Sequence, residues 1–187
     1  MSSDPRAWRI LSSEIRIDTP HLRLRADRAQ LPNGHVVDGY FVRESRGFCV
    51  VFAVTPRDEV VLVRQYKHGA GEVLTELPAG GIDAAETPEE CARRELREET
   101  GYVAERWRFV RTFVADPTNS NGRFHLFLAT GAEQRAETAM EATEEIETFT
   151  VPRAELEAMV RDGRITVGSQ VAAIFVGLEA WAHMPEH

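Results

Sequence analysis

The sequence predicts a mixed α/β domain preceded by a smaller antiparallel β element. Its 187 residues are 43% hydrophobic and 28% charged, which supplies enough apolar material for a packed core. The apolar run FCVVFAV at 48–54 is typical of a strand buried on both faces. Helix start and stop signals enclose residues 87–101, and loose apolar–polar alternation over 10–45 indicates the antiparallel element in front.

The expected strands follow from apolar patterns separated by turn residues. In the N-terminal element, Asn33-Gly34 can take the positive φ angles of a tight hairpin turn. Pro56, Arg57 and Asp58 mark the turn that follows the buried run. We expect strands at about 21–31, 35–44, 48–54, 59–66, 108–114 and 124–130.

The first helix has a defined beginning and end. Thr87 is a candidate N-cap, Pro88 fits the first helical position, and Glu90 completes a capping box with Thr87. Gly101 is the expected glycine just after the last turn. These signals predict a short, well-bounded helix.

Two further helices are expected near the C-terminus. One begins near Pro152 and ends at Gly163, and the other spans about 168–183. The apolar residues of the second have helical spacing, and we interpret them as core residues: Val171, Ile174, Phe175, Leu178 and Trp181.

Charge and cysteine content limit the classes of partner. A net charge of −8 argues against a general nucleic-acid surface or an anionic membrane as the partner. It does not exclude a small phosphorylated ligand, because a bound metal can reverse the local sign. Cys49 and Cys91 are the two cysteines, so a disulfide framework is not expected, and Cys49 is interpreted as a small core residue. Without an apolar leader segment or an 18-residue apolar run, we expect a soluble cytoplasmic protein.

Three glutamates of the first helix share one sector: Glu95, Glu98 and Glu99. Like charges at this spacing cost roughly 0.2–0.5 kcal/mol per pair. One interpretation is a solvated acidic face offset by neighbouring arginines, namely Arg93, Arg94 and Arg97. The other is a site for Mg²⁺ or Mn²⁺, which prefer carboxylate and carbonyl oxygens. The loop PAGG at 78–81 favours the second, because its backbone can approach a ligand closely.

The segment Gly80–Tyr102, GGIDAAETPEECARRELREETGY, resembles the Nudix box, the sequence signature of the Nudix hydrolase family. Every fixed position of that signature agrees over these 23 residues, so a chance match is improbable. Tyr102 occupies the loosely specified last position. The matching residues are Gly80, Glu86, Arg94, Glu95, Leu96, Glu98, Glu99 and Gly101.

The resemblance implies an α/β/α sandwich and hydrolysis of a nucleoside diphosphate linked to another group, with Mg²⁺ or Mn²⁺ as cofactor. It implies that Glu95 and Glu99 are the main metal ligands, with Glu98 as a further one. The carbonyl of Ala79 would complete the coordination sphere. Arg94 would orient the glutamates together with Glu86, and we count Arg94 and Glu98 among the candidate catalytic residues.

The flanks are similar to the ADP-ribose pyrophosphatase group, whose members hydrolyse nucleoside diphosphate sugars. VLVRQYKHGAGEVLTELPAG precedes the box, with Lys67 in place of the usual arginine, and Pro117 follows Gly101 by 16 residues. The resemblance implies that residues 1–45 form an antiparallel β domain involved in a homodimer, and that 46–187 form the Nudix domain. In the segment DPTNSNGRFH, no acid stands between Pro117 and His125, unlike much of the group.

The candidate substrate-binding residues lie on both sides of the box. They are Arg64, Lys67, Glu76, Pro117 and Arg123. Glu76 could equally support a turn, and the two cations could pair with glutamates.

The catalytic base of this group comes from a loop outside the box. The acidic run AETAMEATEEIE occupies the corresponding place, and Glu144 is our first choice, with Glu141 and Glu145 as neighbours. The run could equally be only a solvated acidic loop.

Hydrolysis of a nucleoside diphosphate sugar, with ADP-ribose tried first, is the leading hypothesis. A dinucleoside polyphosphate or RNA-cap hydrolase would keep the chemistry and change the substrate. A non-catalytic nucleotide sensor is the alternative from another class. Such sensors often lose box glutamates, and all are present here, which favours the enzyme.

Overall fold

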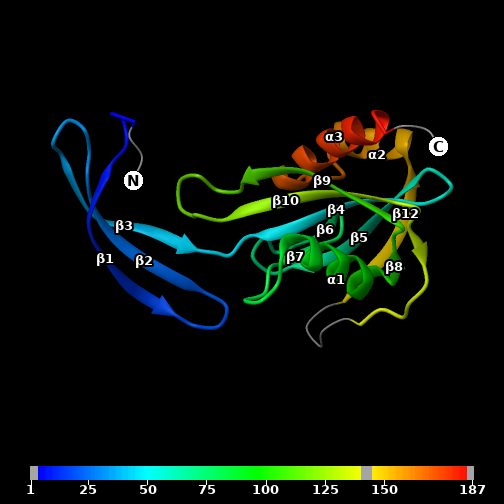
Figure 1. Cartoon of the computed structure of the whole chain (residues 1–187), viewed down its shortest axis with the longest axis horizontal. Helices are drawn as coiled ribbons and strands as arrows, with labels where there is room; N and C mark the ends of the chain where they lie inside the picture. The colour runs from blue at the N-terminus through cyan, green and yellow to red at the C-terminus, as the bar shows by residue number, and fades with distance from the viewer. Residues whose placement is uncertain (1–3, 140–144, 185–187) are drawn as a thin grey trace. The chain divides into compact units, whose positions relative to one another are not determined.

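The computed structural model describes residues 4–139 and 145–184, which form two compact units. The smaller unit comprises residues up to 46 together with 114–123, and the larger one comprises 47–113 together with the chain from 124 onward. Segment 114–123 therefore makes its contacts in the smaller unit, although the expected boundary at 45/46 assigns it to the second domain. The elements of both units are labelled in Figure 1.

The smaller unit is built on a three-stranded antiparallel sheet in the order β1-β2-β3. Its strands are β1 (Arg9–Asp18), β2 (Arg23–Gln30) and β3 (Val36–Glu44). Asp27 is buried in this sheet, where it accepts hydrogen bonds from Ser13 Oγ at 2.6 Å and Arg25 Nε at 3.0 Å. A buried carboxylate is tolerated when it is paired in this way.

The turn between β2 and β3 differs from the expectation for Asn33-Gly34. Only Gly34 has a positive φ, of 86°. Asn33 instead uses its side chain, whose Oδ1 accepts a hydrogen bond from the amide of His35 at 3.0 Å. Asparagine commonly stabilises turns through such bonds to the backbone nearby.

Strand β1 was not predicted as a strand. Register shifts interrupt its pairing with β2 between Ile10 and Ser12 and between Ile15 and Ile17. Each shift breaks the two-residue period by which a strand is recognised in a sequence.

The larger unit contains a seven-stranded mixed sheet with central order β12-β5-β4-β10-β9, while β6 pairs with β5 and β7 pairs with β4. Strand β4 runs parallel to β10 and antiparallel to β7. A separate short pair joins β8 (Tyr102–Val103) to β11 (Glu133–Gln134). The strands of the large sheet are β4 (Phe48–Val54), β5 (Glu59–Lys67), β6 (Glu72–Glu76), β7 (Ala79–Gly81), β9 (Arg106–Val114), β10 (Arg123–Thr130) and β12 (Ile146–Pro152).

Helices cover both faces of the large sheet, as Figure 1 shows. Helix α1 (Pro88–Thr100) packs on one face, against alternate residues of β4 that include Cys49 and Val51. Helices α2 (Arg153–Arg161) and α3 (Gly168–Ala182) pack on the opposite face. The predicted α/β/α sandwich with a separate antiparallel sheet in front is confirmed.

The apolar stripe of α3 is buried only in part. Ile174 and Leu178 belong to the core, whereas Phe175 is 53% exposed. The prediction that Phe175 is a core residue is wrong, because Phe175 follows the buried Ile174 directly and so lies about 100° away from it around the helix. On its packed side, the helix lies close to the sheet at Gly177. A Cβ on Gly177 would lie 2.3 Å from the ring of Phe52.

Within the described residues, no helix combines the length and apolar character needed to cross a membrane.

Candidate active site

Helix α1 is fixed at both ends by the predicted caps. Thr87 Oγ1 accepts a hydrogen bond from the Glu90 amide at 3.3 Å, and Glu90 Oε2 accepts one from the Thr87 amide at 2.8 Å. At the other end Gly101 has a φ of 71°, and its amide donates to the carbonyl of Arg97 at 2.8 Å. The first and last residues of the helix are therefore set by the local sequence.

The buried face of α1 orients its acidic sector. Cys91, Ala92 and Leu96 are fully buried against the sheet. This packing turns Glu95 and Glu99 toward the backbone of β7, and only 4% of Glu99 is exposed. Glu99 therefore does not belong to a solvated acidic face, whereas Glu98 keeps 30% of its side chain exposed and pairs with Arg94 and Arg97.

Arg94 joins the carboxylates of the sector. Its Nε and Nη2 form a bidentate pair with Glu86 at 2.8 and 2.9 Å. Its Nη1 lies 2.7 Å from Glu95 Oε1 and 3.3 Å from Glu98 Oε2. Nη2 also donates to the carbonyl of Gly81 at 3.0 Å. A single guanidinium therefore offsets the repulsion among three carboxylates.

The pairing of Glu86 with Arg94 shifts the pKa values of both groups toward their charged forms. The hydrogen bonds from Arg94 hold the pKa of Glu86 below the ordinary glutamate value. The Glu86 carboxylate in turn raises the pKa of Arg94, with further contributions from Glu95 and Glu98. Glu86 and Arg94 are therefore both charged at neutral pH.

Strand β7 approaches α1 closely because its residues lack large side chains. The amide of Ala79 donates to Glu99 Oε2 at 3.0 Å. At Gly80, a Cβ would lie 2.0 Å from Glu95 Oε1, so only glycine leaves room for that carboxylate. The loop PAGG and the two glutamates thus form one assembly of main-chain groups and carboxylates.

Carboxylate and carbonyl oxygens, the donors present in this assembly, are the ligands that a hard divalent cation prefers. Glu95 fills the space left by Gly80, and Glu99 is held beside Ala79. Over residues 4–139 and 145–184, however, no three His, Cys, Asp or Glu side chains converge to hold a metal ion. Glu95 and Glu98 face Arg94, whose guanidinium supplies the positive charge in this arrangement.

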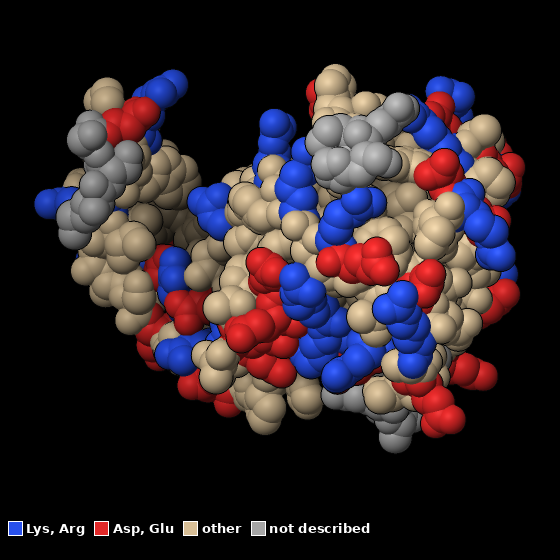
Figure 2. Space-filling view, turned by 45° about the vertical axis from the view of Figure 1, so that its right-hand side comes forward, with Lys and Arg blue, Asp and Glu red and all other residues tan. Residues whose placement is uncertain are grey.

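Figure 2 shows acidic and basic side chains gathered beside one another on the lower part of the larger unit. The other two arginines of the helix make separate pairs. Arg93 pairs with Glu89 at 2.7 Å and lies over the ring of Trp107, while Arg97 pairs with Glu98 at 3.3 Å. Arg94 is thus the arginine that joins Glu86, Glu95 and Glu98.

Three predicted substrate-binding residues lie on β5 and β6 of the same unit. Lys67 Nζ is 3.2 Å from Glu76 Oε2, and that buried oxygen has no hydrogen-bond partner among the described residues. Arg64 pairs with Glu147 on β12 at 2.9 Å and lies over the ring of Phe149. Arg64 and Lys67 therefore both pair with glutamates in this structure, as the alternative interpretation expects.

The other two predicted substrate-binding residues lie in the smaller unit. Pro117 lines a hollow of about 300 Å³ together with Trp8, Arg25 and Tyr40. Arg123 is the first residue of β10. The structure therefore brings Arg64, Lys67, Glu76 and the box together in one unit, and it does not bring Pro117 or Arg123 into that unit.

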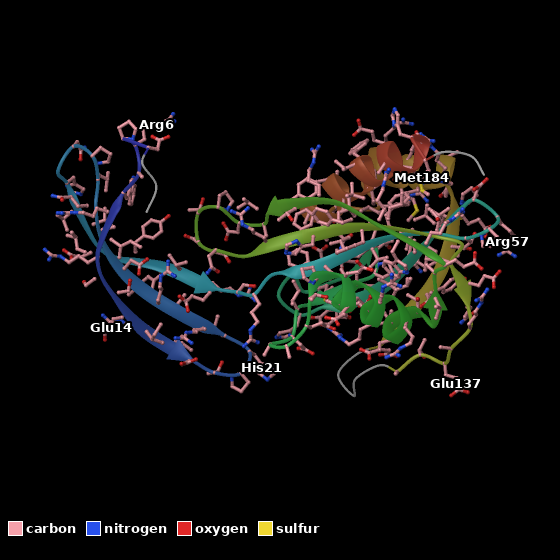
Figure 3. The ribbon with its side chains drawn as sticks, in the orientation of Figure 1. Arg6, Glu14, His21, Arg57, Glu137 and Met184 are labelled. Atoms are coloured by element: carbon pink, nitrogen blue, oxygen red, sulfur yellow. The ribbon has the colours of Figure 1, made fainter. Side chains whose placement is uncertain are left out.

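The expected catalytic base lies outside the described residues, as does its neighbour Glu141. Glu144 thus stays a prediction. Glu145 is described and exposed, and it immediately precedes β12. Figure 3 shows Glu137, on the segment between β11 and β12, pointing away from the sheet.

Two residues that support the site were not predicted. Gln170 on α3 is buried, and its Oε1 accepts a hydrogen bond from the amide of Leu77 at 3.1 Å, which anchors the chain just before Ala79. The available signal was a glutamine near the start of a mostly apolar helix. Thr148 on β12 donates to the carbonyl of Glu99 at 3.2 Å, and no local pattern marks it.

Comparison with known families accounts for nearly the whole chain. A sequence model of the NUDIX domain matches residues 43–168, which is more than half of the chain. A second model, described as the nucleoside diphosphate sugar hydrolase N-terminal domain, matches residues 8–42.

Individual relatives agree with this assignment. A methanol dehydrogenase activator from Bacillus methanolicus is 29% identical over 82% of this chain and 83% of its own length. ADP-ribose pyrophosphatases from Bacillus subtilis and Mycobacterium tuberculosis are 34% and 35% identical. The matches cover 57% and 66% of this chain, and 57% and 60% of those enzymes.

The fold also matches a solved structure. A crystal structure of an ADP compounds hydrolase superposes with a TM-score of 0.80 over 96% of both chains, at 20% identity. This match supports the fold, while the family models and the complete box carry the assignment. The chain therefore belongs to the Nudix hydrolase family.

Proposed function

We propose that this chain hydrolyses the diphosphate linkage of a nucleoside diphosphate sugar, with ADP-ribose as the first substrate to test. Water would attack one phosphorus, the bridging P–O bond would break, and a nucleoside monophosphate and a sugar phosphate would leave. The observation that carries this proposal is the close assembly of Glu95, Glu99 and the Ala79–Gly80 backbone. The ADP-ribose pyrophosphatases among the relatives support the choice of substrate.

Nudix hydrolases generally require a divalent metal. In our proposal Glu95 and Glu99 are the main ligands of Mg²⁺ or Mn²⁺, with Glu98 and the carbonyl of Ala79 as further ones. A bound divalent ion would neutralise charge on the phosphate oxygens and activate water. Arg94 and Glu86 would orient the glutamates, since Arg94 already contacts Glu95 and Glu98.

The remaining assignments concern substrate and proton transfer. We propose that Arg64 and Lys67 contact phosphate and that Glu76, whose Oε2 is buried beside Lys67, binds the substrate. Pro117 and Arg123, both in segment 114–123, would also contact the substrate. Glu144 would act as the general base.

We also propose that the chain works as a homodimer through its N-terminal domain. That sheet exposes large apolar side chains, including Ile10 and Phe41. Exposed apolar groups gathered on a small unit are typical of a surface that another chain covers.

A panel of nucleoside diphosphate derivatives tests the reaction. Each compound is incubated with the protein and Mg²⁺ or Mn²⁺, and the products are identified by mass. We expect ADP-ribose to give AMP and a ribose phosphate. The panel includes NAD, because dehydrogenases use nicotinamide dinucleotides and one relative is named as a dehydrogenase activator.

The second candidate is a nucleotide sensor that binds and does not cleave. A compound that binds tightly but stays intact with either metal would support the sensor and contradict the hydrolase. The presence of every box glutamate favours the hydrolase.

A further inference from the structure

The carbonyls in the C-terminal turn of α1 need hydrogen-bond donors from outside the helix. An α-helix leaves the carbonyls of its last turn without partners inside the helix. In α1 this turn carries Glu98 and Glu99, two of the proposed metal ligands. Whatever satisfies these carbonyls therefore also holds the two side chains in place.

Two other segments of the chain supply the missing donors. The amide of Ala139 donates to the carbonyl of Glu98 at 3.0 Å. The hydroxyl of Thr148 donates to the carbonyl of Glu99 at 3.2 Å. The amides of Arg135 and Ala136 donate to the carbonyl of Gly101 at 3.0 and 3.1 Å. Among these donors, only that of Thr148 belongs to a side chain.

Thr148 is a firm point of attachment because of its strand. β12 pairs with β5 without interruption from Ile146 to Pro152, and Thr148 lies opposite Val63. Thr148 is half-buried, so water has limited access to the Glu99 carbonyl that its hydroxyl binds. Its bond to Glu99 thus ties the end of α1 to the central sheet.

Glu99 is held at both its main chain and its side chain. Thr148 binds its carbonyl, while the amide of Ala79 binds its carboxylate at 3.0 Å. A shift of the carbonyl would move the carboxylate relative to β7. We infer that Thr148 is a positioning residue, which sets the metal affinity of the site by fixing Glu99. This inference rests on the proposed function, because it takes Glu99 to be a metal ligand.

The test compares three variants of β12. Thr148→Val keeps the shape of the side chain and removes the hydroxyl, and Thr148→Ser restores a hydroxyl. Thr150→Val is the matched control, because Thr150 lies two residues along the same strand and donates to Glu59 at 3.2 Å, away from α1. Mn²⁺ binding is measured by the electron paramagnetic resonance signal of free Mn²⁺, without substrate.

We expect Thr148→Val to raise the Kd for Mn²⁺ by about two- to tenfold, the range set by one ordinary hydrogen bond. Thr148→Ser and Thr150→Val should bind Mn²⁺ as the wild type does. In the hydrolysis assay, Thr148→Val should require more metal for half-maximal rate, with little change in the KM for the nucleotide at saturating metal.

Equal Mn²⁺ affinity in Thr148→Val and Thr150→Val, with a wild type that does bind the ion, would overturn the positioning role alone. A wild-type chain that binds no Mn²⁺ and cleaves nothing would overturn the proposed function and this inference together.

Discussion

At the scale of single residues, Gly80 determines whether the acidic sector fits against β7. An added Cβ would lie 2.0 Å from Glu95 Oε1 and 2.1 Å from its carboxyl carbon. Gly80→Ala must therefore displace the carboxylate. We expect kcat/KM to fall by about a hundredfold, the cost of misplacing a catalytic group by about 1 Å.

Gly81→Ala is the control for this substitution. A Cβ at residue 81 meets nothing within 4 Å, and its φ is not in the left-handed region. It should leave kcat/KM near the wild-type value. Equal activity of the two variants would show that the position of Glu95 does not matter for turnover.

The charge of Glu99 provides a second test at this scale. Glu99→Gln keeps an oxygen that can accept from the Ala79 amide and removes the negative charge. We expect a loss of several orders of magnitude in kcat. We also expect the loss of most of the rise in Tm that Mg²⁺ produces, because a ligand stabilises only the state that binds it. Activity and Tm are measured with and without Mg²⁺.

Glu89→Gln is the matched control, because Glu89 lies at the start of the same helix and pairs with Arg93. It should keep both the activity and the metal response. Unchanged turnover in Glu99→Gln would contradict the metal assignment.

The pair of Glu86 and Arg94 makes a prediction about pH. Arg94 lowers the pKa of Glu86 in the folded protein, so the pair stabilises the fold above the ordinary carboxyl pKa. That stability is lost as the pH falls through the lowered pKa. Urea unfolding at pH 7 and at pH 3 should show Glu86→Gln less stable than the wild type at pH 7, with a smaller difference at pH 3. A difference that does not change with pH would contradict the pairing.

Sequence reasoning identified the box residues because their identities and spacing are local properties of one helix. It did not find how Arg94 divides its bonds among Glu86, Glu95 and Glu98, since that depends on the side chains being packed together. Thr148 was missed for a related reason. Its role arises from the pairing of β12 with β5, far away in the sequence.

At the scale of elements, α1 was predicted with its bounds because both of its caps are encoded nearby. The predicted strands 48–54 and 59–66 agree closely with β4 and β5, since buried apolar runs are clear signals. β12 was not predicted, because its apolar residues Ile146, Phe149 and Val151 do not keep the two-residue period of a strand. β1 was not predicted because its register shifts hide the alternation.

The N-cap of α1 makes a prediction about stability. Thr87→Ala removes the acceptor for the Glu90 amide and breaks the capping box. We expect a loss of about 1 kcal/mol in the free energy of unfolding, measured with urea. Thr138→Ala, at an exposed position outside any helix or strand, is the control and should change little. Equal stability of both variants would show that the cap does not contribute.

At the scale of the whole molecule, the exposed apolar residues of the N-terminal sheet predict self-association. Every residue of β1 is exposed, including Ile10 and Ile15. Glu14 of this strand is labelled in Figure 3. We expect a dimer by light scattering coupled to size exclusion. Ile15→Lys should shift it toward monomer, because a buried unpaired charge is costly. Ser12→Lys, on the same strand, is the comparison variant. A wild type that is monomeric at micromolar concentration would contradict the prediction.

The smaller unit is not a simple N-terminal extension, because segment 114–123 belongs to it. Thr118 accepts a hydrogen bond from the hydroxyl of Tyr40 at 2.6 Å, and Asn119 accepts one from the amide of Arg43 at 2.7 Å. A truncation that begins at residue 47 would leave this loop without its partners. The chain therefore passes between the two units three times, at 46/47, 113/114 and 123/124. A graft that transfers the N-terminal domain to another Nudix protein must carry the loop between β9 and β10 with it.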